Sequence, residues 1–187
     1  VPHGMSKQQT PLTKMGKRSA YGLGDLLHGR VSDITTSNMY SCVETALGIS
    51  MGAGYTGRLR TNPEWGLPGV FVEDRERAAR LLRDKGVIWT YQYMAGNPQA
   101  ALPGMRSCFH GSAILVRDLH FFKIPKGEVA VYVTHDSLLS CLIAGITRRP
   151  ILPRNWPAYL EGFVLWVDDW KMAVANRGIC LPVSGPF

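Results

Sequence analysis

Polar side chains that can move protons or attack an electrophilic centre stand at three places in this sequence. His3 lies in "PHG" near the start, and Ser37 ends the stretch "RVSDITTS". His135 and Asp136 lie between the apolar runs "EVAVYV" and "SLLSCLIAGI". Imidazole is a nucleophile and a proton carrier near neutral pH, and a carboxylic acid can supply a proton to a leaving group. These residue types therefore indicate nucleophilic or acid–base chemistry, provided that the fold brings them together.

The pair His135-Asp136 also has a purely structural interpretation. Asp136 precedes an apolar helical pattern, and Asp is a preferred residue at a helix N-terminus, where its carboxylate accepts hydrogen bonds from free N–H groups. His135 would then be a loop residue bonded to the backbone. The same helix N-terminus carries a partial positive charge, which favours an anionic ligand. The sequence alone leaves both interpretations open.

Helices and strands alternate along most of the chain, and this order decides where the polar residues lie. Such alternation favours an α/β fold, which we expect to be a three-layer sandwich with a mostly parallel central sheet flanked by helices. Ligands of such folds bind at the carboxyl ends of the strands. Apolar periodicity predicts helices at 13–28, 38–52, 74–86, 104–122 and 136–146, strands at 30–37, 69–74 and 128–134, two strands within 160–176, and a strand or lid-like loop within 87–105.

A chain of 187 residues is long enough to bury a full core, so we expect a single domain over residues 1–187. The segment 55–110 is rich in Pro, Gly and aromatic residues, and it is a candidate lid or cap. Its aromatic side chains either line an apolar pocket above the strands or belong to the core. The residues concerned are Trp65, Trp89, Tyr91 and Tyr93.

The net charge of +7, from 21 basic and 14 acidic residues, would suit an anionic partner. The basic residues are scattered, however, and the densest cluster, Lys14, Lys17 and Arg18, has the pattern of a solvated helix face. No nucleic-acid-binding motif accompanies the charge. No run of 18 apolar residues exists that would span a membrane. We therefore expect a small-molecule substrate, with neither nucleic acid nor a membrane as partner.

The four cysteines, Cys42, Cys108, Cys141 and Cys180, form no C-x-x-C pair and have no histidine at zinc-site spacing. They are predicted to be buried free thiols in a reducing compartment, so we expect a cytoplasmic protein without a metal site or cofactor. The chain begins with Val1 and shows no basic-then-apolar leader, so any leader is expected to have been removed or trimmed.

Four short motifs occur in an order that resembles the histidine phosphatase superfamily, which includes phosphoglycerate mutases and histidine acid phosphatases. The motifs are "PHG" at 2–4, "LTKMG" at 12–16, "SNMYSCVETA" at 37–46 and "THDSLLSCLIAGI" at 134–146. Each motif is weak by itself, but the ordered set covers most of the chain. The resemblance implies a phosphoglycerate mutase-like sheet with the motifs at its carboxyl edge.

The resemblance also implies roles for the residues in these motifs. His3 takes the position of the histidine that attacks phosphorus, and His135 that of the second histidine, which binds and polarises the phosphoryl oxygens. Asp136 takes the position of the acid that protonates the leaving group in one branch, whereas Glu64 in "NPEWG" is the candidate for that role in others. The residues expected to bind the substrate are Gly4, Lys7, Ser37 and Ser41.

The sequence departs from the family pattern at both arginines that clamp the phosphoryl group. Pro2 stands in place of the first and Ser41 in place of the second. Arginine suits this task because its planar fork binds two oxygens at once, whereas proline has no donor and serine has a single neutral one. Basic residues from elsewhere in the chain are possible substitutes, although each can equally be a surface charge. They are Lys7, Arg58, Arg60, Arg106, Arg148 and Arg149.

Three functions are compatible with this mixture of retained and missing groups. The first is a repurposed enzyme that uses His3, His135 and Asp136 for acid–base chemistry on a less charged small molecule. The second is a phosphomonoester hydrolase that forms a phosphohistidine at His3 and recruits cations from elsewhere. The third is a binding protein that keeps the fold without catalysis, a pseudophosphatase.

Overall fold

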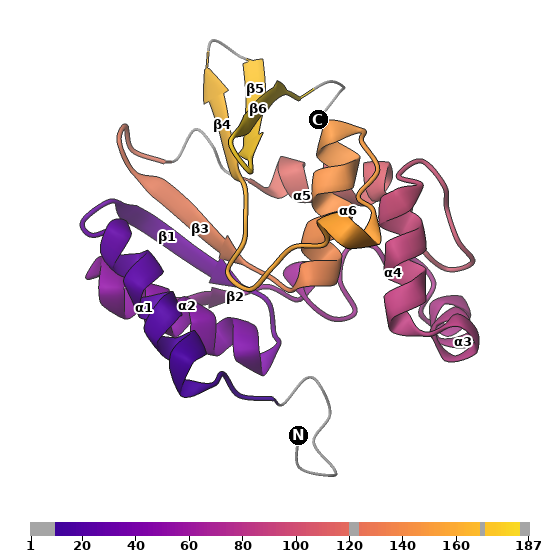
Figure 1. The fold of residues 1–187 in the computed structure, drawn as a ribbon, viewed down its shortest axis with the longest axis horizontal. Coiled ribbons are helices and arrows are strands. Elements are labelled where there is room, and N and C mark those ends of the chain that lie inside the picture. Colours follow the sequence, from indigo (N-terminus) through magenta and orange to yellow (C-terminus); the bar gives the residue numbers. More distant parts are fainter. Residues whose placement is uncertain (1–9, 120–123, 169–170, 184–187) are drawn as a thin grey trace. The chain divides into compact units, whose positions relative to one another are not determined.

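The computed structural model describes residues 10–119, 124–168 and 171–183 (Figure 1), and the chain divides into two compact units. Unit one contains the chain up to Leu67 and the segment that ends at His135. Unit two contains Pro68–Phe121 and Asp136–Phe187. The expected lid segment 55–110 therefore contributes to both units. A single domain with such a lid stays a prediction.

A three-stranded parallel sheet forms the centre of unit one (Figure 1). Its strands are β1 (Val31–Thr36), β2 (Arg60–Thr61) and β3 (Val129–Val133), in the order β2-β1-β3. Thr36, the last residue of β1, is in register with Thr61 on one side and Val133 on the other. The α/β class with a parallel sheet is thus confirmed, and all three strands end at the same edge.

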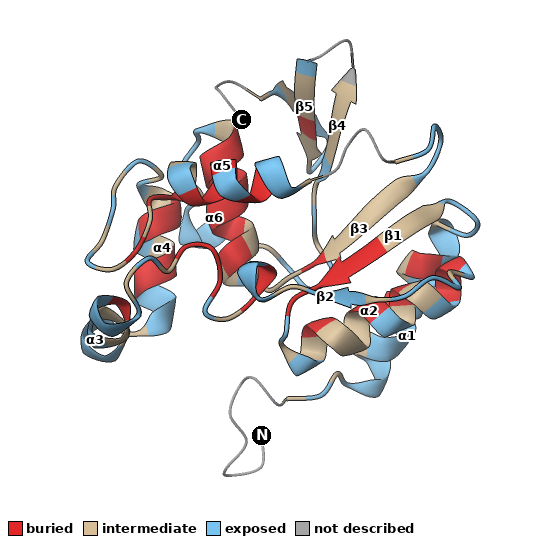
Figure 2. Ribbon diagram, turned by 180° about the vertical axis from the view of Figure 1, so that it is seen from behind, coloured by how far each residue is buried: buried red, intermediate tan, exposed pale blue. Residues whose placement is uncertain are grey.

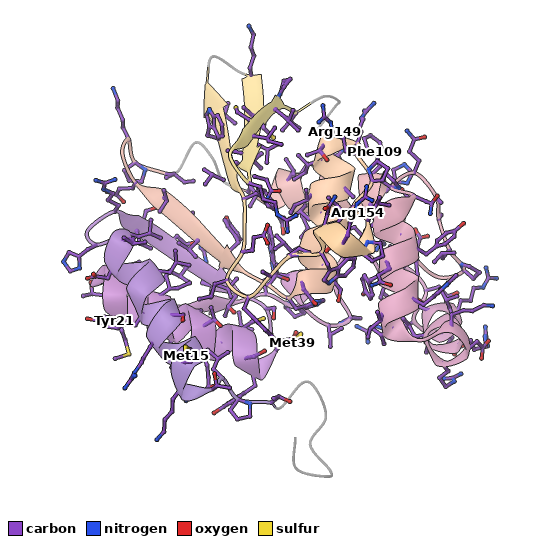
Figure 3. All side chains as sticks on the ribbon, viewed as in Figure 1. Met15, Tyr21, Met39, Phe109, Arg149 and Arg154 are labelled. Atoms are coloured by element: carbon purple, nitrogen blue, oxygen red, sulfur yellow. The ribbon has the colours of Figure 1, made fainter. Side chains whose placement is uncertain are left out.

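Two helices, α1 (Lys14–Leu26) and α2 (Tyr40–Ala53), pack together and bury one face of this sheet. Thr13 caps α1, since its Oγ1 accepts a hydrogen bond from the N–H of Gly16 at 3.0 Å. Figure 2 shows the carboxyl half of β1 among the buried parts of unit one. The opposite face of α1 is exposed and carries Met15 and Tyr21, which Figure 3 labels. The core cluster contains Ile34, Cys42, Ala46, Ile49 and Val133.

Glu44, on α2, ties the chain before α1 to the core of unit one. Its Oε2 accepts a hydrogen bond from the N–H of Leu12 at 2.6 Å, and its Oε1 lies 2.5 Å from Nζ of Lys17. Leu12 and Glu44 belong to two of the four sequence motifs, "LTKMG" and "SNMYSCVETA". These two motif residues therefore support the fold, whatever the chemistry at the sheet edge.

We expect this arrangement to make the stability of the protein sensitive to acid. The Lys17 ammonium, followed by the Leu12 N–H, lowers the pKa of Glu44 from its ordinary value of 4.5. Because the folded state has the lower pKa, the stabilisation is present above the ordinary pKa and is lost as pH falls through the folded value. We expect the free energy of unfolding of Glu44→Gln to fall less steeply than that of wild type from about pH 5 to about pH 3. Urea denaturation at several pH values measures this, and parallel curves for the two proteins would contradict it.

Unit two contains four α-helices among its described residues: α3 (Arg75–Lys85), α4 (Val87–Gly96), α5 (Cys108–Asp118) and α6 (Asp136–Thr147). Helices α4 and α5 both pack against α6, whose residues are largely buried (Figure 2). A short 3₁₀ helix, η4 (Pro153–Asn155), follows α6. The unit also contains a small antiparallel sheet of β4 (Val164–Asp168), β5 (Lys171–Asn176) and β6 (Ile179–Pro182). The predicted pair of strands within 160–176 is thus confirmed as β4 and β5.

Two predicted elements in unit two are wrong. Segment 69–74 forms no strand but a turn with a single bridge between Val72 and Met105, because the Arg106 guanidinium binds the carbonyls of Val70 and Val72 at 2.7 and 3.0 Å. The β-forming residues at the start of 87–105 form helix α4 instead. Their apolar spacing lets one face pack on α6, and such packing overrides local propensity.

Burial corrects the expectation for one cysteine, and it divides the four aromatic residues between the core and the surface. Cys42, Cys108 and Cys141 are buried thiols outside any disulfide, as predicted, but Cys180 is exposed because it lies on β6, at the edge of the small sheet. Trp65 and Tyr91 are buried, whereas Trp89 and Tyr93 lie on the surface. Within the described residues, no helix combines the length and apolar character that crossing a bilayer requires.

Candidate functional site

The ends of β1, β2 and β3 are tied together by backbone hydrogen bonds at the carboxyl edge of the parallel sheet. The N–H of Ser37 donates to the carbonyl of Val133 at 2.8 Å, and the N–H of Asn62 donates to the carbonyl of Thr36 at 2.9 Å. The loops after the three strands therefore leave the sheet from fixed, adjacent positions. Loops of this kind, on a rigid sheet, commonly carry the binding and catalytic residues of α/β proteins.

A short 3₁₀ helix, η2 (Pro63–Trp65), lies beside this edge and carries Glu64. The Oγ1 of Thr134 donates to the carbonyl of Trp65 at 2.6 Å, and the Trp65 ring packs on Tyr132 with the centroids 4.7 Å apart. The Glu64 side chain is exposed, and its N–H donates to the side chain of Asn62. The loop after β2 is therefore held against the loop after β3, and the Glu64 carboxylate forms no ion pair among the described residues.

His135 and Asp136 follow β3 directly. His135 is half-buried and is the last residue of unit one, whereas Asp136 is exposed and begins α6. The Oδ1 atom of Asp136 accepts hydrogen bonds from the N–H and the hydroxyl of Ser137, at 2.7 and 3.1 Å. Its Oδ2 atom accepts one from the indole N–H of Trp156 at 3.0 Å. This acceptor-only arrangement suits a carboxylate, and it holds Asp136 at the first turn of the helix.

Ser37 directly follows β1, and Ser41 lies in the first turn of α2, the next helix along the chain. Ser37 is fully buried, and its Oγ accepts a hydrogen bond from the N–H of Met39 at 3.1 Å. It thereby supports the N-terminal end of α2, where Met39 is labelled in Figure 3. Ser41 is half-buried in the first turn of α2. Ser37, Ser41, Glu64 and His135 all belong to loops or turns at one edge of the same sheet.

Thr36 is a residue of this edge that the sequence analysis did not identify. Its side chain is 1% exposed, and its Oγ1 has no hydrogen-bond partner among the described residues. A buried hydroxyl without a partner is costly, so such a group commonly marks a place where water or a ligand binds. The sequence did contain a signal for Thr36, because it is the last residue of a predicted strand and a polar loop follows it.

The remaining candidates lie outside the described residues, in unit one or in unit two. His3, Gly4 and Lys7 lie outside the described residues. In unit one, Arg60 forms an ion pair with Asp33, and Arg58 is exposed. The three further candidate arginines belong to unit two, where two of them contact other residues and one is exposed. Arg106 binds two backbone carbonyls, Arg148 stacks over the Phe109 ring at 4.8 Å, and Arg149 is exposed (Figure 3).

No group of three or more His, Cys, Asp or Glu side chains is placed to hold a metal ion in the part of the chain that the structure describes. Among the described residues, the polar groups at the sheet edge are hydroxyls, backbone N–H groups and the His135 imidazole, and the Glu64 and Asp136 carboxylates are nearby in sequence. Such a set can orient a polar ligand and move a proton.

Comparisons with known proteins give a fold and no sequence family. No protein-family model matches the chain, and no curated protein matches its sequence. Among solved structures, YhfR of Bacillus stearothermophilus is similar with a TM-score of 0.60 and 23% identity, over 91% of this chain and 86% of that one. A phosphoglycerate mutase from Bacillus anthracis has a TM-score of 0.51 and 15% identity, over 95% and 82%. A mycobacterial glucosyl-3-phosphoglycerate phosphatase has a TM-score of 0.51 and 18% identity, over 93% and 82%.

These solved structures, among them a phosphoglycerate mutase and a phosphatase, match about nine-tenths of this chain. The predicted phosphoglycerate mutase-like fold is thus confirmed. At identities this low the similarity concerns the fold, and the chemistry must be argued from the residues at the sheet edge.

Proposed function

We propose that this protein, whose fold is that of the histidine phosphatases, binds a small molecule at the carboxyl edge of its parallel sheet and uses His135 for acid–base catalysis. The substrate would carry less negative charge than a phosphomonoester. One observation carries this proposal: the strand ends that hold Ser37 and His135 are joined directly, by the hydrogen bond from Ser37 N–H to the Val133 carbonyl at 2.8 Å. A half-buried histidine beside a polar, rigid edge is suited to exchange a proton with a bound ligand.

The limited positive charge among the described residues of this edge supports a less charged substrate. Phosphoryl transfer depends on positioning and on stabilising the charge of the phosphoryl oxygens, which guanidinium groups do well. Ser41 occupies the position that the family resemblance gives to an arginine. One possible substitute within unit one, Arg60, is neutralised by Asp33. A ligand with a carbonyl or hydroxyl group needs only the single donors that serine and backbone N–H groups supply.

The proposed roles follow from the chemistry of each side chain. His135 accepts or donates the proton of the reacting group, and Asp136 or Glu64 supplies a carboxylate for the opposite transfer. Ser37 and Ser41 orient the ligand, together with Gly4 and Lys7 if the beginning of the chain reaches this edge. His3 would then be the nucleophile or a second base. We expect neither a metal nor a cofactor in this reaction.

Phosphomonoester hydrolysis is the second candidate, favoured by the similarity to a phosphatase and a phosphoglycerate mutase. In that case His3 would form the phosphohistidine, and Lys7 or another basic residue would replace the clamp. A non-catalytic binding protein is the third possibility. One pair of chromogenic substrates with the same leaving group separates the three functions.

The test compares the turnover of p-nitrophenyl acetate, which is uncharged, with that of p-nitrophenyl phosphate. We expect the acetate to be the better substrate, and His135→Asn to lower its turnover at least tenfold, since acid–base catalysis contributes about that much or more. His110→Asn, which changes an exposed histidine of α5, is the matched control and should leave turnover unchanged.

Two results would overturn the proposal. Efficient turnover of the phosphate ester that is lost in His3→Ala would establish the second candidate. Turnover of neither ester by wild type, with orthovanadate and p-nitrophenol also failing to raise the melting temperature, would leave no catalytic or ligand-binding site at this edge.

A further inference from the structure

Helix α3 gives unit two a strongly basic surface that the proposed chemistry does not use. Its sequence, "RERAARLLRDK", contains five cations and two carboxylates, and Figure 2 shows the helix largely exposed. Only Ala78 is buried, and the helix packs mainly against α4. The exposed cations are Arg75, Arg77, Arg80, Arg83 and Lys85.

The chain continues from this helix into three consecutive apolar side chains that are exposed. Gly86, with φ of +84°, turns the chain from α3 into α4, and Val87, Ile88 and Trp89 follow with exposed fractions of 52%, 61% and 43%. We call these three residues the apolar tip. One turn further along, Tyr93 is also exposed, and its ring stacks on Trp89 with the centroids 5.2 Å apart.

The core of unit two does not need the apolar tip. The face of α4 that packs inward consists of Thr90, Tyr91, Met94 and Ala95, which are all buried. The tip residues stand on other faces of the first turn, where they expose apolar area to water. Contiguous exposed apolar side chains beside polar ones commonly mark an interaction surface. Lys85, whose ammonium lies 5.8 Å from the Trp89 ring centroid, places positive charge directly against this area.

We propose that α3 and the apolar tip form a peripheral docking surface for an anionic lipid membrane. Arginine and lysine side chains near a membrane attract anionic headgroups, and their aliphatic stems can lie along the boundary with the acyl chains. Tryptophan is enriched at that boundary, and valine and isoleucine gain from leaving water. Binding to anionic lipid would thus be a function for part of the net charge of +7.

Lipid fits this surface better than nucleic acid does. Single-stranded nucleic acid stacks its bases on open aromatic faces. Trp89 already stacks on Tyr93 and carries the Lys85 ammonium, and Val87 and Ile88 offer neither a ring nor a hydrogen bond. Binding to the surface of a membrane requires no spanning helix, so it is consistent with the absence of one among the described residues. The proposal differs from the expectation that a membrane is no partner of this protein, and the vesicle experiment decides between the two.

Cosedimentation of the full chain with lipid vesicles tests the proposal. Vesicles of phosphatidylcholine alone are compared with vesicles of phosphatidylcholine and phosphatidylserine in equal parts. We expect binding to the anionic vesicles only, and weaker binding as salt is added. The double variant Arg80→Gln/Arg83→Gln should bind about tenfold more weakly at low salt. The double variant Ile88→Ser/Trp89→Gln should lose a similar or larger factor, because the apolar contribution disappears.

Matched controls change the same residue types elsewhere in unit two. Arg154→Gln on η4 and Ile179→Ser on β6 alter exposed side chains outside the proposed surface, and both should bind like wild type. Circular dichroism and melting temperatures of all variants verify that each one is folded. Equal binding by the tip variant and by Ile179→Ser would overturn the proposal. So would binding of a single-stranded oligouridine that depends on Arg80 and Trp89 while the vesicles remain unbound.

Discussion

Replacing Gly52 by alanine should lower the free energy of unfolding by about 2 kcal/mol, although alanine is the better helix former. A Cβ at this position would lie 2.1 Å from the carbonyl oxygen of Tyr21 and 2.7 Å from the backbone nitrogen of Asp25. Backbone atoms cannot rotate away as a side chain can, so α1 and α2 would have to move apart. That movement would loosen the packing of Ile49 and Ala46 against the sheet.

The matched control is Gly22→Ala on α1. A Cβ there meets no atom within 4 Å, so the substitution should raise the free energy of unfolding by about 0.5–1 kcal/mol through helix propensity. The two variants thus make the same chemical change with opposite expected signs. Urea denaturation with wild type, Gly22→Ala and Gly52→Ala measures both. If Gly52→Ala is as stable as Gly22→Ala, α1 and α2 do not pack at backbone contact.

This helix pair shows what the sequence can predict and what it leaves open. The boundaries of α1 and α2 follow from apolar periodicity and from Thr13 as a cap, and the structure agrees within a few residues. The closeness of the pair depends on small residues one turn apart. Gly48 on α2 lies against Ala20, and Gly24 on α1 lies against the Ile49 backbone. Each of these is weak evidence by itself, because their effect arises only when the two helices are side by side.

The secondary structure of segments 69–74 and 87–96 was predicted wrongly for a different reason. Both contain β-forming residues in short apolar runs, for which periodicity cannot separate a strand from a buried helix. The deciding interactions come from distant parts of the chain. Arg106 takes the carbonyl groups of Val70 and Val72, and α6 provides the surface on which α4 packs.

Some residues of the candidate site could likewise be predicted from the sequence, and others could not. Ser37 and His135 were identifiable because each follows an apolar strand, and the ends of parallel strands meet at one edge. The contribution of Asn62 and Trp65 was not, because β2 has two residues and η2 has three, too few to show a period. Their backbone contacts with Thr36 and Thr134 exist only once the sheet has formed.

Introducing the missing clamp as Ser41→Arg should raise the affinity for orthovanadate by about 10- to 100-fold. This prediction assumes that the ligand binds at the proposed site on the sheet edge. Ser41 is half-buried in the first turn of α2, where the N-terminal end of the helix already favours an anion. Glu44, three residues along the helix, is a competing partner for the new guanidinium. Its carboxylate is already engaged by Lys17 and the N–H of Leu12, which leaves the arginine available to a ligand.

The neighbouring substitution Tyr40→Arg provides the control, because it adds the same charge to the same helical turn from an exposed position. Long-range electrostatic attraction would raise the affinity for orthovanadate equally in both variants. A bidentate contact between the guanidinium and the oxyanion is possible only from residue 41, because residue 40 points in another direction on the helix. Calorimetric titration of orthovanadate into wild type and both variants separates the two effects. A gain confined to Ser41→Arg would mean that the edge keeps the geometry of a phosphate site and lacks only its charge. Equal gains in both variants, or none, would mean that residue 41 does not face the ligand, and the assignment of Ser41 to the clamp position would fail.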